Sequence, residues 1–347
     1  MSEHRRPHVD VIIPAFDEEA HIGACLDHVM AQDYPAGLIR VWVVDAGSTD
    51  RTVEVVQARQ DAEPRLTLIA GHGRLNHGRA LNLGLALSDA ELVARVDAHM
   101  NIAPTYLRCA VERLAGASPK VAGVGGQATL TGDTRFGAAV GLARSSRFGV
   151  AGSIYADRRT FAVVDTVPCG VFRRPALEAV GGFETVFPAG EDEECNWRLR
   201  KAGYDLLLDT RLEFTYATRS SWRALFRQHR NYGHSRAYVV ARHPDFLRVR
   251  HTVPSAFVTT LAGLALAGLA SRRARWALGT TVAAYGTAAA AAGVAATAAS
   301  DRWLAPYVTA SYAAMHLGYG VGMLAGAGSL VGARLGLVAP RTTVTRR

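Results

Sequence analysis

Residues 9–13 read VDVII, a short and mostly β-branched apolar run that stops at Pro14. Three more runs of this kind follow, at residues 40–45, 65–70 and 92–97. Segments with helical character separate them, near residues 18–31, 50–60 and 78–88. This alternation of strands and helices predicts an α/β domain, Rossmann-like, with a mostly parallel sheet and helices on both of its faces.

The predicted strands end in acidic or turn-forming residues. The second strand stops at Asp45 and the fourth stops at Asp97. Ligands of open α/β sheets bind beyond the carboxyl ends of the strands, so we expect Asp45 and Asp97 to face a ligand. For Ser48 and Asp50, which follow the second strand, an ordinary helix cap is the alternative.

The usual glycine motifs for binding phosphate do not occur. There is no GxGxxG after the first strand and no GxxxxGK[ST] in the chain, so a nucleotide is not held as in a dehydrogenase or a P-loop enzyme. A strand edge rich in carboxylates would repel a diphosphate. We therefore expect a divalent cation, Mn²⁺ or Mg²⁺, between the protein and the phosphates.

The composition changes at residue 253. Residues 253–330 contain one acidic residue, Asp301, among mostly Ala, Gly, Leu, Val and Thr. A helix that spans a membrane needs about 20 apolar residues; blocks 276–299 and 303–330 are long enough, and 253–270 is marginal. The predicted organisation is a catalytic domain at 1–240, an interfacial linker at 241–252, a membrane domain of two or three helices at 253–335, and a basic tail at 336–347.

Arginine clusters restrict the membrane topology. One cluster, at 272–275, follows the first apolar block, and another lies in the tail. If the catalytic domain is cytoplasmic, three full spans would place both clusters outside, against the positive-inside trend. A re-entrant first block with two full spans keeps both inside. We expect this topology, in a multi-pass protein of the plasma membrane.

The net charge of +9 is compatible with a nucleic-acid partner, but the arginines gather at residues 219–250, beside the apolar blocks. This placement favours anionic lipid headgroups, so we expect membrane lipids and no nucleic acid as partners. The four cysteines form no CxxC pair, and the first residues form no apolar leader. Both features are typical of reduced thiols in a cytoplasmic domain that has no cleavable signal peptide.

An ordered series of motifs runs through the front of the chain: VVDAGSTD at 43–50, NHGRALN at 76–82, VDAH at 96–99, GEDEE at 190–194 and RQHRNYG at 227–233. The series resembles the family 2 glycosyltransferases, which have a GT-A fold, over roughly residues 8–240. It is most similar to bacterial enzymes of the succinoglycan glucosyltransferase type, which build exopolysaccharide repeat units on a lipid carrier.

The resemblance implies a nucleoside pocket lined by Pro14, Ala15 and Glu18, with Asp45 accepting a hydrogen bond from a uracil ring. A carboxylate that accepts from a ring N–H selects uracil through a polar pair that is costly to leave unmade. Arg79 is expected near the base or the diphosphate, and a solvated helix residue is its alternative.

Asp97 and His99 occupy the place of the family's Asp-x-Asp metal motif. Residues i and i+2 of an extended segment lie on the same side, so both side chains are expected to face one cation, with Asp97 also near the ribose. Because imidazole is a softer ligand than the carboxylate that it replaces, Mn²⁺ is favoured over Mg²⁺. A loop histidine without a ligand is the alternative for His99.

Glu191 and Asp192 open a predicted helix that Gly203 ends. By the resemblance, Asp192 is the general base of an inverting reaction and Glu191 lies beside it. The acceptor hydroxyl must lose its proton as it attacks the sugar, and a positioned carboxylate contributes typically ~10²–10⁴-fold to the rate. Stabilisation of the helix dipole is the alternative role for carboxylates at this position.

The acceptor side is assigned to two segments. Cys169 and Gly170 match an acceptor-side loop of the family, with a plain turn as the alternative. Gln228 and Arg230 lie where processive relatives carry Gln-x-x-Arg-Trp. The Arg and Trp of that motif are replaced here, which favours the addition of one sugar over processive synthesis.

Together these features predict a membrane-anchored, inverting, metal-dependent glycosyltransferase. Its expected donor is a UDP-sugar, and its expected acceptor is lipid-linked or a polysaccharide at the cytoplasmic face of the membrane. Two alternatives stay open: direct transfer to a polyprenyl phosphate, and a non-catalytic scaffold that binds a nucleotide at the membrane.

Overall fold

The computed structural model of the chain describes residues 6–149, 161–186 and 189–335. These residues form two compact units, divided near Thr129 and Tyr216. The first unit runs to Thr129 and includes the described residues from 161 to 216, and the second takes 130–149 and 217–335. The tail predicted at 336–347 lies outside the described residues.

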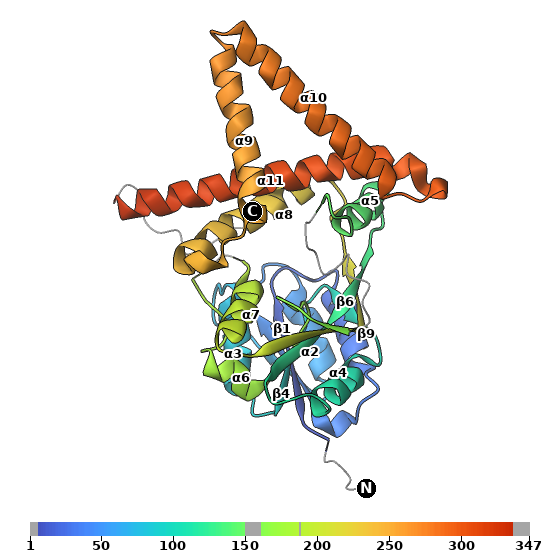
Figure 1. Ribbon diagram of the computed structural model, residues 1–347. Helices are drawn as coiled ribbons and strands as arrows, with labels where there is room; N and C mark the ends of the chain where they lie inside the picture. Colours follow the sequence, from blue (N-terminus) through green and yellow to red (C-terminus); the bar gives the residue numbers. More distant parts are fainter. Residues whose placement is uncertain (1–5, 150–160, 187–188, 336–347) are drawn as a thin grey trace. The chain divides into compact units, whose positions relative to one another are not determined.

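The first unit is an α/β fold (Figure 1), and two of its strands, β6 and β9, end in the second unit. Its elements are β1 Val9–Ala15, α1 Ile22–Met30, η1 Ala36–Leu38, β2 Ile39–Asp45, α2 Thr52–Gln60, β3 Leu66–Ile69, α3 His77–Leu87, β4 Leu92–Arg95, β5 Met100–Ile102, α4 Tyr106–Ala115, β6 Val121–Thr131, β7 Phe161–Val163, β8 Val171–Arg173, α6 Arg174–Ala179, α7 Glu191–Lys201 and β9 Asp205–Ala217.

One sheet runs through this unit in the order β3-β2-β1-β4-β8-β6-β9-β5, with β7 paired to β9. The first four strands are parallel, as predicted, with Val11 opposite both Val41 and Ala94. The strands that follow pair antiparallel, at β4–β8, β6–β8, β5–β9 and β7–β9. The α/β class is confirmed. The complete sheet is mixed, because its remaining strands pair antiparallel and such pairs need no crossover helix.

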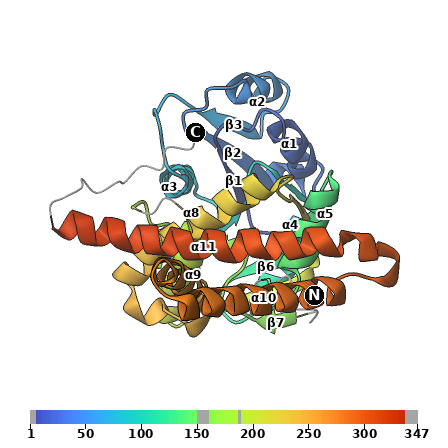
Figure 2. The same ribbon diagram turned by 90° about the horizontal axis from the view of Figure 1, so that it is seen from above.

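Helices cover both faces of the parallel strands. Figure 2 shows α1 and α2 on one face and α3 on the other, which is the arrangement that right-handed crossovers produce when the strand order reverses. Every residue of β1 is buried, as is usual for the central strand of a parallel sheet with both faces covered. The buried core therefore holds the carboxyl ends of β1, β2 and β4 at one edge.

The second unit is helical. Its elements are α5 Arg135–Arg144, α8 Trp222–Arg242, η3 Pro244–Phe246, α9 Val249–Gly268, α10 Arg272–Ala295, η4 Ala299–Leu304 and α11 Ala305–Arg334. Two helical segments, 272–295 and 299–334, are long and apolar enough to cross a membrane.

Glycines let α8 and α11 lie side by side (Figure 2). A Cβ atom built on Gly322 would lie 1.9 Å from the carbonyl oxygen of Arg230, and one on Gly318 would lie 2.6 Å from that of Phe226. The contact positions rise by four residues on α11 (318 to 322) and by four on α8 (226 to 230), so the two helices run parallel. Small residues at this spacing allow two helix backbones to approach closely.

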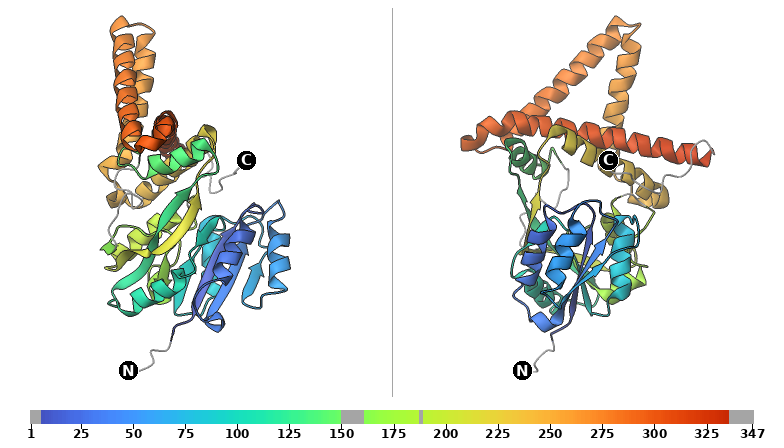
Figure 3. Two further views of the ribbon diagram at one scale, coloured as in Figure 1. Left: turned by 90° about the vertical axis from the view of Figure 1, so that its right-hand side faces the viewer. Right: turned by 180° about the vertical axis from the view of Figure 1, so that it is seen from behind.

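Helices α9 and α10 form an antiparallel hairpin that stands on α11 (Figures 1 and 3). Near the middle of the two helices, Phe257 of α9 and Tyr285 of α10 are in contact, with ring centroids 4.7 Å apart. The Tyr285 hydroxyl lies 3.0 Å from Nδ1 of His316 on α11. The remainder of the hairpin extends away from the other helices of this unit.

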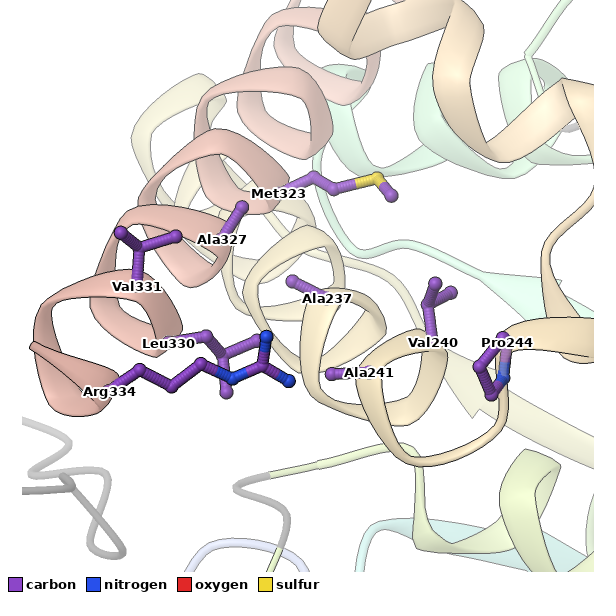
Figure 4. Close-up of a pocket in the computed structure, with 9 residues that line it drawn as sticks. All are labelled: Ala237, Val240, Ala241, Pro244, Met323, Ala327, Leu330, Val331 and Arg334. Atoms are coloured by element: carbon purple, nitrogen blue, oxygen red, sulfur yellow. The ribbon is translucent and has the colours of Figure 1, made fainter.

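An apolar groove of about 400 Å³ runs between the last turns of α8 and α11. Its walls include Val240 of α8 and Met323 and Leu330 of α11, and the guanidinium of Arg334 lies at one end (Figure 4).

Candidate active site

The end of β4 carries the centre of the candidate site. The Arg95 guanidinium donates to both carboxylate oxygens of Asp97, over 3.1 Å from Nε and 3.0 Å from Nη2. Only 9% of the Arg95 side chain and 13% of the Asp97 side chain are exposed. A nearly buried cation therefore lies at the ligand-binding edge of the parallel strands.

The start of α7 brings two more carboxylates to this cation. Gly190, in the left-handed conformation with φ +84°, turns the chain into the helix. Arg95 Nη1 lies 2.9 Å from Asp192 Oδ2, and Nη2 lies 3.9 Å from Glu191 Oε1. The predicted metal motif and the predicted base are thus joined through one guanidinium, which charge-assisted pairs hold in a defined geometry.

His77, the first residue of α3, closes the cluster. Its Nδ1 lies 2.6 Å from Glu191 Oε1 and its Nε2 lies 3.5 Å from Asp97 Oδ1. The next residue, Gly78, lets the helix start approach the loop before α7, because a Cβ there would lie 2.1 Å from the carbonyl oxygen of Glu184. The NHG sequence therefore builds part of the site.

The charges of the cluster shift its pKa values in opposite directions. Burial alone would raise the pKa of Glu191, but His77 and Arg95 outweigh it and hold that pKa well below its usual range. The pKa of Asp97 is likewise lowered, against burial, by Arg95 and His77. Burial lowers the pKa of His77, and the carboxylates of Glu191 and Asp97 overcome it, so the net shift is upward. Ionised carboxylates and a cationic His77 favour one another.

His99 lies in a turn and not in an extended segment. The backbone N–H of Met100 donates to the carbonyl oxygen of Asp97 over 2.8 Å, which closes the turn. The expected strand alternation of Asp97 and His99 is therefore absent, because β4 ends at Arg95. His99 Nδ1 lies 3.0 Å from Glu18 Oε1, and its ring packs edge-on against Tyr216.

The residues expected around the nucleoside lie at the ends of β1 and β2. Pro14 and Ala15 are buried at the end of β1. The Asp45 carboxylate accepts the backbone N–H groups of Gly47 and Ser48, each over 3.1 Å, and so shapes its own loop. Arg79 is exposed on α3.

The residues expected on the acceptor side lie in both units. The Gly170 carbonyl accepts the backbone N–H of Arg95 over 2.9 Å, which places the Cys169–Gly170 loop beside the centre of the cluster. Cys169 has an unusual φ of +48° and is 1% exposed, so the loop presents its backbone. Gln228 and Arg230 lie on α8, in the second unit.

Two members of the cluster, Arg95 and His77, were not among the residues expected from the sequence. Arg95 lies at the end of a buried strand, two residues before Asp97. An arginine in such a strand indicates a site residue, because a buried charge needs a partner. His77 lies in the NHG sequence. Nothing local to that sequence shows that its side chain meets Glu191 and Asp97.

Comparison with known proteins decides the family. Residues 10–181 match the family model for glycosyl transferase family 2. Succinoglycan biosynthesis protein ExoA of Rhizobium meliloti (strain 1021) is 29% identical over 262 residues, which cover 74% of this chain and 77% of ExoA.

The chain is a family 2 glycosyltransferase. The family expected from its motifs is confirmed, as is its similarity to enzymes of exopolysaccharide synthesis. A second relative is the dolichyl N-acetyl-α-D-glucosaminyl phosphate 3-β-D-2,3-diacetamido-2,3-dideoxy-β-D-glucuronosyltransferase of Methanococcus voltae, 25% identical over 266 residues that cover 75% of this chain and 82% of the relative.

Among solved structures, the mannosyltransferase PcManGT from Pyrobaculum calidifontis, in complex with GDP-Man and Mn²⁺, superimposes on this glycosyltransferase with a TM-score of 0.61. The sequences are 24% identical, and the match covers 91% of this chain and 88% of PcManGT. This likeness shows the shared fold.

The described residues of the glycosyltransferase contain no preformed group of three or more metal-ligating side chains. Asp97 and His99 still offer a carboxylate and an imidazole, of which 13% and 25% are exposed. Arg95 uses one lone pair on each oxygen of Asp97, and a carboxylate has about four acceptor sites. Asp97 therefore keeps acceptor sites for a cation, and His99 has Nε2 as a second ring nitrogen beside the Nδ1 that lies against Glu18.

Proposed function

We propose that this glycosyltransferase moves a sugar, with inversion, from a UDP-sugar to a lipid-linked or polysaccharide acceptor at the cytoplasmic face of the plasma membrane. The observation that carries the proposal is the convergence of Asp97, Glu191 and Asp192 on Arg95. It occurs at the strand edge where α/β enzymes bind their ligands.

The donor site is proposed along the ends of β1 and β2. Pro14, Ala15 and Glu18 would line the nucleoside pocket, and Asp45 would accept from the base through its remaining lone pairs. Arg79 is free to approach the base or the diphosphate because it is exposed on α3. PcManGT holds GDP-Man, which supports a nucleotide sugar as the donor class for this fold.

Asp97 and His99 would hold a divalent cation, with Mn²⁺ preferred over Mg²⁺. When bound, the cation neutralises the charge that grows on the departing diphosphate. PcManGT was solved with Mn²⁺, which supports this cofactor. Arg95 and His77 pair with the carboxylates around this position.

Asp192 is the proposed general base. Its side chain is 31% exposed, so an acceptor hydroxyl can reach it, while Arg95 fixes Oδ2 and the Glu193 N–H fixes Oδ1 over 2.8 Å. The carboxylate takes the hydroxyl proton as the acceptor oxygen bonds to the anomeric carbon and the bond to the diphosphate breaks. Glu191, held by His77 and Arg95, keeps the start of α7 in place.

The acceptor is proposed to be lipid-linked in the first instance. The relative from Methanococcus voltae is named for an acceptor in which a sugar phosphate is carried on dolichol, and ExoA is named for polysaccharide synthesis. The Cys169–Gly170 loop lies beside Arg95, and we assign it to the acceptor side together with Gln228 and Arg230.

Release of UDP from a panel of UDP-sugars, with Mn²⁺ and membrane acceptors, tests the proposal. We expect Asp192→Asn to lower turnover by ~10²–10⁴-fold, because the amide cannot accept the proton. Glu193→Gln changes the neighbouring carboxylate on the same helical turn and should leave turnover near wild type. Equal turnover in wild type and Asp192→Asn would remove Asp192 as the base.

Analysis of the product separates the proposed reaction from its alternatives. A new glycosidic bond to a sugar already on the lipid supports the proposal. A lipid that carries one phosphate and one sugar would show direct transfer to a polyprenyl phosphate and overturn the proposed acceptor. Tight nucleotide binding without turnover on any acceptor would indicate a scaffold and overturn the enzymatic role.

A further inference from the structure

The three long C-terminal helices differ in how much of their surface is covered. Only His251 and Gly268 of α9 are buried, and only Ala289 and Gly293 of α10. In the most apolar stretch of α11, 33% of the residues are buried, against 11% for α10. Helices α9 and α10 therefore need an apolar environment, whereas α11 already has protein on one side.

The partner of α11 is an arginine-rich helix. The glycines at 318, 322 and 326 of α11 lie against the carbonyl groups of Phe226, Arg230 and His234 on α8. This spacing holds the two helices together over most of the length of α8. Arg223, Arg227 and Arg230 are exposed on α8.

A helix with several exposed arginines does not lie in hydrocarbon, because each charge at the centre of a bilayer costs at least ~2.5 kcal/mol. From Gly318 to Arg334, α11 runs parallel to α8 and touches it, so this part of α11 cannot cross a bilayer unless α8 does so too. Away from the groove, α11 exposes Val321 and Leu324. Such apolar side chains fit a helix that lies flat in the boundary between headgroups and hydrocarbon. The apolar groove between α8 and α11, with Arg334 at one end, fits the same position (Figure 4).

The hairpin has the dimensions of a membrane insertion. Helix α9 has 20 residues and α10 has 24, which correspond to lengths of ~30 Å and ~36 Å, and the hydrocarbon core is ~30 Å thick. By hydropathy only α10 of the two is a candidate span, because the first turn of α9 carries Arg250 and His251. Leu266 and Val282 are 70% and 51% exposed, a costly arrangement in water.

The turn of the hairpin has features of the opposite membrane surface. Arg272 and Arg273 begin α10, and the Arg275 guanidinium donates to the carbonyl oxygen of Gly268 over 2.7 Å, which caps α9. Trp276 beside them is 65% exposed. Arginine and tryptophan at the end of an apolar helix pair are typical of the boundary between hydrocarbon and headgroups.

The hairpin begins and ends on the same side of the membrane. Helix α9 follows α8, which the chain connects to β9 through residues 218–221. Helix α10 leads to η4, where Trp303 lies under the guanidinium of Arg135 of α5, 5.6 Å from the ring centroid. Residues 132–134 connect α5 to β6. Within the second unit, the feet of the hairpin therefore follow or contact helices, α8 and α5, that short segments of chain join to β9 and β6.

We propose that α9 and α10 cross the bilayer as a hairpin, while α11 lies along the near surface on α8. The number of spans stays at two, but the spans differ from those expected from hydropathy, which were 276–299 and 303–330. The arginine-bearing turn at 269–275 is then on the far side of the membrane, which reverses the side expected for this cluster from the positive-inside trend. Both the 298–302 loop and the C-terminus are on the near side.

Three single cysteines test this topology in intact cells with a membrane-impermeant maleimide. They are Ala270→Cys in the turn, Ser300→Cys in the loop, and a cysteine added after Arg347. The native cysteines at 25, 109, 169 and 195 are all buried, so the wild-type chain serves as the background control. Thermal unfolding in detergent confirms that each variant folds.

We expect labelling from outside at residue 270 only, with the other two positions labelled after permeabilisation. Two spans formed by α10 and α11 would reverse the first two results, labelling Ser300→Cys from outside and Ala270→Cys from inside. Three spans would label both Ala270→Cys and the added terminal cysteine from outside. Either pattern overturns the proposal.

Extraction with alkaline carbonate supplies the remaining arm of the test. Retention in the membrane pellet is expected for a crossing hairpin. Release would mean that another protein surface, such as a second copy of the chain, covers the hairpin, and would overturn the proposal. These readouts do not depend on any donor or acceptor, so their failure would leave the proposed reaction intact.

Discussion

Arg95 is the residue on which the geometry of the site depends most. Its planar guanidinium reaches Asp97 through two nitrogens and Asp192 through the third. A lysine ammonium is a point charge that cannot reproduce this fork. In the proposed reaction, Arg95 is therefore a positioning residue for both Asp97 and Asp192.

We expect Arg95→Lys to lower kcat by about 10²-fold, since displacing a catalytic group by ~1 Å has an effect of this size. Arg108→Lys is the matched control, because Arg108 forms only exposed pairs with Asp33 and Glu112. UDP release gives kcat, and thermal unfolding shows whether the fold is kept. A folded Arg95→Lys protein with wild-type kcat would contradict the positioning role.

Asp209 in β9 predicts how the first unit responds to acid. Its side chain is fully buried and paired with Arg113 and Arg211, over 2.7 and 2.8 Å. Burial would raise the pKa of Asp209, but the two arginines overcome this effect and lower it. A carboxyl group with a depressed folded-state pKa binds fewer protons when folded. It therefore stabilises the fold above its unfolded value of ~3.9, and this stabilisation is lost as the pH falls through the depressed value.

The melting temperature measured between pH 3 and 7 should thus fall steeply below about pH 4 in the wild type. Asp209→Asn should have a lower melting temperature at pH 7 and a shallower acid slope, because two arginines lose their counter-charge. Asp165→Asn removes an exposed carboxylate that pairs with Arg200, and should keep the wild-type profile. Identical slopes in all three proteins would rule out Asp209 as a source of acid sensitivity.

At the scale of elements, the packing of α11 on α8 predicts that alanine at two glycines of α11 changes the stability of the second unit in opposite directions. A Cβ on Gly322 would lie 1.9 Å from the Arg230 carbonyl oxygen, whereas one on Gly328 would meet nothing within 4 Å. Gly322→Ala should destabilise the second unit by ~1–3 kcal/mol through overpacking. Gly328→Ala should stabilise α11 by up to ~1 kcal/mol.

Thermal unfolding in detergent measures both variants under the same conditions. They share a helix and a chemical change, so intrinsic helix propensity cancels between them. A rise in melting temperature for both would mean that α11 does not lie on α8 as described, and would also weaken the case for α11 at the membrane surface.

Elements with long or strongly patterned sequences were predictable, and short ones were not. The first four strands are β-branched runs bounded by Pro, Gly or Asp, and they form as expected. Strands β5, β7 and β8 have three residues each, too few to show alternation. Strands β6 and β9, of 11 and 13 residues, complete the antiparallel half, and length does not explain why their antiparallel pairing was not predicted.

The same distinction applies to the site. A carboxylate after a strand follows a local rule, so Asp97 could be singled out from the sequence, whereas Glu191 and Asp192 were expected from the resemblance to the family. Their convergence on Arg95 and His77 depends on contacts between residues far apart in the chain, which no local pattern encodes. The turn at residues 97–99 was missed because the end of β4 lies two residues earlier than the run of apolar residues indicates.

At the scale of the whole molecule, charge is divided between the two parts of the chain. The chain has 30 acidic residues, and Asp301 is the only one within 253–330. The reaction is thus assigned to a unit rich in carboxylates, and attachment to anionic lipids to a unit rich in arginine. Hydropathy could identify the apolar helices, but only the packing of α8 on α11 distinguishes a helix that crosses from one that lies flat.

The arginine-bearing turn between α9 and α10 has a consequence for biogenesis. If the hairpin crosses as proposed, three guanidinium groups, those of Arg272, Arg273 and Arg275, must be exported through a membrane whose interior face is electrically negative. Each positive charge moved outward works against the potential by ~2.3 kcal/mol per 100 mV. Insertion of the newly made chain is therefore expected to be faster in de-energised cells, although turnover of the finished enzyme carries no such dependence.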